Sequence, residues 1–165
     1  MILEMAASTI ISVGGAPTQG ASETAWFVTQ EAEKGRLRLQ ESYAFGMAGK
    51  GVLSELLETA KECREPNWDG YGAAPVADST YQLAQEFLKA LPLGTTAPTI
   101  GAEPDGHITV EWYRSPRRTL SVSISPNGEL HYAALIGSSK AFGTEAFFGE
   151  APKVIVDLIH RVMAV

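Results

Sequence analysis

The stretch ITVEWYRSPRRTLSVSISPNGELHYAALI, residues 108–136, alternates apolar and polar side chains along three runs. Successive side chains of a β-strand point to opposite faces, so this alternation predicts strands with one buried and one wetter face. The turn-forming tetrapeptides SPRR (115–118) and SPNG (125–128) separate the runs. The stretch therefore predicts an antiparallel meander. The side chains expected to face the core are Ile108, Val110, Trp112, Leu120, Val122, Ile124, Leu130, Tyr132, Ala134 and Ile136.

Two flanking segments extend the predicted sheet, and apolar stripes around it predict three helices. TIGAE (99–103) and AFGTEAFF (141–148) are expected to be the outer strands. Apolar residues at three- and four-residue spacing predict one helix that starts at Gly51 and stops before Pro66, and a second between Asp78 or Ser79 and Pro92. A C-terminal helix is expected to start near Pro152.

The N-terminal residues predict further β structure, with a strand at 8–13 and a hairpin formed by 24–30 and 36–45. The element order becomes βββ-αα-βββ(β)-α. Strands and helices are segregated, which predicts an α+β fold with a mainly antiparallel sheet. We interpret residues 1–165 as a single domain, in which 1–46 form an N-terminal β subregion and 47–165 the αα-β-meander-α core.

Composition restricts the classes of function. The 165 residues carry a formal net charge of −6 and a single cysteine, and the pI is about 5.1. Phosphate neutralisation needs a basic surface, so direct nucleic-acid binding is not expected. One cysteine allows no intrachain disulfide and fits a reducing compartment, and no run is long and apolar enough to span a membrane. These features predict a cytoplasmic protein.

The motifs do not indicate a catalytic or metal site. GMAGKG (46–51) stands between a predicted strand and helix, but lacks the Mg²⁺-binding hydroxyl of a Walker loop. Cys63 lies on the apolar stripe of its helix and is expected to be a core residue. His107, His131 and His160 are isolated in the sequence and are interpreted as surface residues. We therefore predict no catalytic residues, no metal ligands and no cofactor.

Two charged groups flank predicted turns. Glu103 and Asp105 border one turn and are interpreted as surface charges, since the sequence does not show that they converge. Arg114, Arg117 and Arg118 form a basic cluster at a hairpin tip, which could clamp a carboxylate or phosphate of a partner. The alternative for this tip is simple solvation.

The stretch PNWDGYGAAP (66–75) supports two interpretations. As a ligand site, Trp68 and Tyr71 would stack on a sugar or base while Asp69 bonds its hydroxyls. As a corner between two helices, its glycines would supply positive φ, Asp69 would accept backbone hydrogen bonds and Trp68 would plug the corner. The corner interpretation explains every residue type with fewer assumptions.

Four segments together resemble a set of small bacterial proteins that share a Trp-Asp-Gly-x-Gly-Ala-x-Pro turn and a downstream strand containing PDG and EW. The segments are NWDGYGAAPV (67–76), AEPDGHITVEWY (102–113), SVSISPNGELHYAALIG (121–137) and GTEAFF (143–148). The resemblance covers roughly residues 63–162. It implies a bacterial or phage protein associated with mobile elements or with defence and toxin–antitoxin-like loci, and it transfers no activity.

The leading functional hypothesis is a non-enzymatic protein-interaction module, antitoxin-like or inhibitor-like, that binds another protein through its N-terminal hairpin or an exposed sheet edge. The partner would be encoded nearby or come from a host or phage, and a homodimer is also left open. The alternative is a small-ligand-binding domain or cryptic enzyme with a pocket beside Trp68, Asp69 and Tyr71. The candidate partner-binding residues are Trp26, Arg36, Arg38, Arg114, Arg117 and Arg118.

Overall fold

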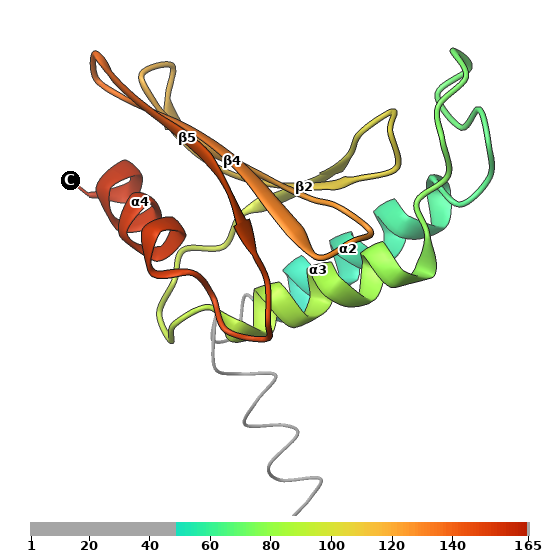
Figure 1. Ribbon diagram of the computed structural model, residues 1–165, viewed down its shortest axis with the longest axis horizontal. Coiled ribbons are helices and arrows are strands. Elements are labelled where there is room, and N and C mark those ends of the chain that lie inside the picture. The colour runs from blue at the N-terminus through green and yellow to red at the C-terminus, as the bar shows by residue number, and fades with distance from the viewer. Residues whose placement is uncertain (1–48, 165) are drawn as a thin grey trace, which may run out of the picture. The chain divides into compact units, whose positions relative to one another are not determined.

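Five strands form one antiparallel sheet in the computed structural model of the protein, which describes residues 49–164 (Figure 1). The strands follow one another across the sheet in sequence order. They are β1 (Thr99–Ala102), β2 (Ile108–Ser115), β3 (Arg118–Ile124), β4 (Glu129–Ile136) and β5 (Ser139–Ala146). The predicted meander and both predicted outer strands are confirmed.

The N-terminal predictions lie outside the described residues. These are the strand at 8–13, the hairpin of 24–30 and 36–45, and the candidate residues Trp26, Arg36 and Arg38.

Three helices are described, α2 (Gly49–Glu62), α3 (Asp78–Ala90) and α4 (Lys153–Met163). They lie on one side of the sheet (Figure 1). Helix α2 begins two residues before the predicted start, and α3 begins at Asp78 as expected. The fold is α+β, as the segregation of strands and helices predicts. None of the helices within 49–164 has the length and hydropathy that a membrane-spanning segment requires.

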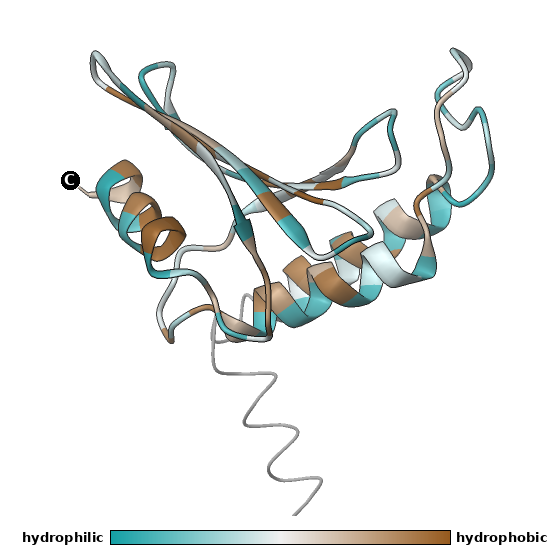
Figure 2. Ribbon diagram, viewed as in Figure 1, coloured by the Kyte–Doolittle hydropathy of each residue, from teal (hydrophilic) through white to brown (hydrophobic). Residues whose placement is uncertain are grey.

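The core fills the space between the helices and the inner face of the sheet. Of the ten sheet side chains predicted to face inward, eight are buried, while Tyr132 and Ile136 are half-buried. The ring of Phe87 on α3 meets Phe147 edge to face, with centroids 5.9 Å apart. Trp112 is buried and donates its indole N–H to the carbonyl oxygen of Thr96 at 2.8 Å. In Figure 2 apolar residues of α3 lie toward the sheet and polar residues outward, as expected for an amphipathic helix.

The opposite face of the sheet is covered by no helix of the described region. The strand register places Thr109 beside Ser123, Ser123 beside His131, and His131 beside Thr144. These side chains share one face because paired residues of neighbouring strands point the same way. We call this the open face.

Candidate functional site

The α2–α3 loop is a closed corner with three residues in the left-handed region of backbone space. Their φ values are 64° for Asn67, 77° for Gly70 and 95° for Gly72. The prediction that both glycines supply positive φ is confirmed, and Asn67 is an additional case that the sequence interpretation missed. Asparagine tolerates this conformation better than most residues do. The amide of Gly72 also donates to the side-chain oxygen of Asn67 at 2.7 Å.

The polar groups proposed to bind a ligand in this loop form hydrogen bonds within it. One carboxylate oxygen of Asp69 accepts hydrogen bonds from the backbone N–H groups of Tyr71, at 2.8 Å, and Ala73, at 3.1 Å. These bonds, that of Tyr71 first, hold the pKa of Asp69 below its ordinary value. Trp68 donates its indole N–H to the carbonyl oxygen of Ala74 at 3.0 Å. Tyr71, by contrast, leaves 95% of its surface exposed.

The loop is attached to the β1–β2 turn. The amide of Ala74 donates to the carbonyl oxygen of Pro104 at 2.8 Å. Gly106 in the same turn has a φ of 86°, and a Cβ atom there would lie 2.8 Å from the carbonyl oxygen of Pro75. Only glycine allows both the backbone conformation and the close approach. The corner at 66–75 and the turn bordered by Glu103 and Asp105 therefore form one unit.

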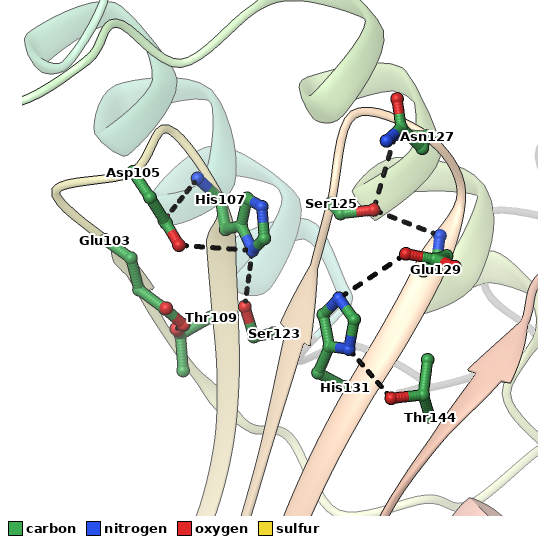
Figure 3. A network of polar contacts seen from close by, with 10 residues as sticks. All are labelled: Glu103, Asp105, His107, Thr109, Ser123, Ser125, Asn127, Glu129, His131 and Thr144. Atoms are coloured by element: carbon green, nitrogen blue, oxygen red, sulfur yellow. Dashed lines mark hydrogen bonds and ion pairs between the residues drawn. The ribbon is translucent and has the colours of Figure 1, made fainter.

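The β1–β2 turn brings Glu103, Asp105 and His107 together (Figure 3). One possible ligand atom from each of the three side chains lies within 4.8 Å of the others. His107 Nδ1 is 3.6 Å from Asp105 Oδ2 and 3.1 Å from the hydroxyl oxygen of Ser123. The hydroxyl of Thr109 donates to a carboxylate oxygen of Glu103. Two carboxylates interpreted as separate surface charges thus converge on one imidazole.

His107 and His131 also lie together on the open face. Their rings are stacked, with centroids 5.9 Å apart and planes within 10° of parallel. His131 Nδ1 is 2.9 Å from the hydroxyl of Thr144, and its Nε2 is 3.8 Å from a carboxylate oxygen of Glu129 (Figure 3). His107 and His131, which are isolated in the sequence, are therefore neighbours in the fold. Strand register, which linear spacing does not reveal, brings them together.

Two arginines of the β2–β3 hairpin contact the end of α4. Arg114 donates from Nη1 to the carbonyl oxygen of Met163 at 3.1 Å, and Arg118 donates from Nη1 to that of Ala164. The last carbonyls of a helix have no partner within it and carry partial negative charge. Arg114 and Arg118 thus have a structural role at the end of α4. The side chain of Arg117 is exposed.

Beyond the histidines, the open face carries exposed aromatic rings among small polar residues. Tyr113 on β2 is 57% exposed and Phe142 on β5 is 81% exposed. Both share the parity of the open-face residues in their strands. The serine and threonine residues of this face are Thr99, Thr109, Thr119, Ser121, Ser123 and Thr144.

Cys63 is buried at the corner, as predicted from its place on the apolar stripe. Burial raises the pKa of its thiol, and the nearby carboxylate of Glu62 raises it further. Both effects disfavour the thiolate, so Cys63 has the properties of a core residue.

Comparison of the chain with protein families, with curated proteins and with solved structures finds no match. The resemblance based on the Trp-Asp-Gly-x-Gly-Ala-x-Pro turn stays a prediction.

Proposed function

We propose that the protein is a non-enzymatic interaction module that binds another protein through the open face of its sheet. The observation that carries the proposal is the pair of exposed aromatic rings, Tyr113 and Phe142, on a face that no described helix covers. The specific form of this proposal is an antitoxin-like or inhibitor-like protein of a bacterium or phage, whose partner is encoded nearby or comes from a host or phage.

The composition of the open face supports protein recognition. Aromatic rings supply contact area at low cost in side-chain entropy, and serine and threonine supply adaptable hydrogen bonds. Tyr113 and Phe142 provide the aromatic rings, and serine and threonine side chains such as Ser121 and Thr144 provide the hydrogen-bonding groups. The face therefore offers both the apolar anchors and the polar groups that a protein interface needs.

The edge of the sheet supports the same proposal. β5 is the last strand of the sheet and pairs on one side only, with β4, among the described strands. An edge strand presents unpaired backbone groups that can bind a strand of a partner. Because Phe142 lies on β5, the exposed ring and the free edge would belong to one interface.

The test is photocrosslinking in the host cell with the full chain. A photoreactive phenylalanine analogue replaces Phe142 in one sample and Tyr71, another highly exposed aromatic residue on the α2–α3 loop, in the control. We expect a crosslink to a different protein from position 142, none from position 71, and loss of the crosslink when Tyr113→Ser is added.

Three results would contradict the proposal in this form. A crosslink from position 142 only to residues 1–48 of the same chain would show that the open face is covered internally. A crosslink only to a second copy would indicate a homodimer. No crosslink at position 142 together with a specific one at position 71 would favour a site at the loop.

The alternative of a ligand pocket beside the α2–α3 loop has less support. The carboxylate of Asp69 and the indole N–H of Trp68 are already used in hydrogen bonds of the loop. A ligand would have to compete with those bonds, whose loss would open the corner.

A further inference from the structure

We propose that Glu103, Asp105 and His107 bind a divalent transition-metal ion, and that Zn²⁺ fits the site best. This inference is independent of the proposed protein interaction. It rests on the convergence of three donors from the β1–β2 turn, two carboxylates and one imidazole (Figure 3). It also revises the prediction that the chain holds no metal ligands.

The distances suit a site that closes around an ion. Ligand atoms around tetrahedral zinc, at about 2.0–2.2 Å from the metal, lie roughly 3.3–3.5 Å apart. His107 Nδ1 and Asp105 Oδ2 are already 3.6 Å apart, and all three donors are within 4.8 Å of one another. The remaining approach would come from small rotations of the carboxylate side chains, since Asp105 is exposed and Glu103 is half-buried.

The charge at this position favours a cation. Within residues 49–164, neither Glu103 nor Asp105 forms an ion pair with a lysine or arginine, whereas Asp78 pairs with Arg64 and Asp157 with Lys153. The imidazole of His107 lies within 4.8 Å of both carboxylates and is itself a metal ligand. A divalent cation would neutralise both carboxylates at once.

The surrounding contacts would hold the ligands in place. Thr109 donates a hydrogen bond to Glu103, and Asp105 Oδ1 accepts one from the amide of His107 at 3.2 Å. The amide of Gly106 donates to the carbonyl oxygen of Glu103 at 2.9 Å, which closes the turn. Such outer contacts orient metal ligands and contribute to affinity.

The mixed donor set selects among ions. Imidazole favours Zn²⁺ and related transition metals, whereas Ca²⁺ and Mg²⁺ prefer sites built of oxygen alone. Three protein ligands leave a fourth tetrahedral position for water or an external donor. The side chain of His107 is 19% exposed, so the site would remain accessible from the open face.

The experiment is titration of the EDTA-treated full chain with ZnCl₂ by calorimetry, and with CoCl₂ by visible absorption. We expect one ion per chain and a cobalt spectrum that includes nitrogen ligation. His107→Gln and Asp105→Asn should each weaken Zn²⁺ binding by roughly tenfold or more, and Glu103→Gln should also weaken it. Thermal melts of the metal-free variants would show that each is folded.

The control is His160→Gln, because His160 is an exposed histidine on α4, outside this cluster. It should leave Zn²⁺ affinity unchanged. The proposal is overturned if the wild-type chain shows no binding, if His107→Gln binds as tightly as the wild type, or if His160→Gln loses the ion. An equal loss of Zn²⁺ affinity in His131→Gln would also overturn the proposal, because His107 and His131 would then be the ligands.

Discussion

The backbone amide of Ala74 donates a hydrogen bond of 2.8 Å to the carbonyl oxygen of Pro104. This bond joins the α2–α3 loop to the β1–β2 turn, two segments that lie far apart in the sequence. The loop thereby supports the turn that carries Glu103, Asp105 and His107. We therefore expect substitutions in the loop to lower the stability of the fold. By loosening the turn, they should also displace its three side chains.

The carboxylate of Asp69 should stabilise the corner. We expect Asp69→Ala to lower the melting temperature at pH 7, because the N–H groups of Tyr71 and Ala73 lose their acceptor. Asp69→Asn keeps a side-chain oxygen acceptor and should lower it less. Thermal melts followed by circular dichroism measure both changes. An unchanged melting temperature in Asp69→Ala would contradict the corner interpretation.

The same residue should give a pH dependence of known sign. Its hydrogen bonds hold the pKa of the folded carboxyl below the ordinary value of 3.8. A lowered pKa contributes stability that is complete above the unfolded pKa and is lost as the pH falls toward the folded pKa. The stability difference between wild type and Asp69→Asn should be constant near neutrality and narrow below about pH 4. Urea unfolding at several pH values measures it.

Gly106 should be the least replaceable glycine of the sheet turns. Gly106→Ala would place a Cβ atom 2.8 Å from the carbonyl oxygen of Pro75, with a positive φ. We expect a loss of about 2–4 kcal/mol in the free energy of unfolding, because strain and a backbone clash coincide. Gly101→Ala is the matched control, since its added Cβ would meet no atom within 4 Å. Similar losses in both variants would contradict this explanation.

Arg118 should contribute to stability through the end of α4. We expect Arg118→Ala to cost about 0.3–1 kcal/mol, because the helix carbonyls lose a cationic donor. Arg117→Ala, in the same hairpin, should cost less, since Arg117 is exposed and its backbone bond to Gly137 is kept. Urea unfolding compares the two. A larger loss in the free energy of unfolding for Arg117→Ala than for Arg118→Ala would contradict a stabilising role of the contact between Arg118 and α4.

Much of the fold follows from local patterns. The alternation through Trp112 and Val122 predicts which strand face is buried, because the period of two is a property of the strand itself. The corner glycines could be assigned positive φ from the same short stretch. The contacts of Arg114 and Arg118 with the end of α4 could not be predicted, because α4 approaches from a distant part of the chain.

Within residues 49–164, the sequence by itself determined the helices and strands, their order, the buried face of the sheet and the positive φ of Gly70 and Gly72, since each depends on neighbouring residues. Only the tertiary structure decided that His107 stacks on His131 and that Ala74 bonds to Pro104. The physical reason is that these contacts depend on strand register and on the packing of separate segments. The position of a polar residue in the sequence does not indicate which distant group its side chain will contact.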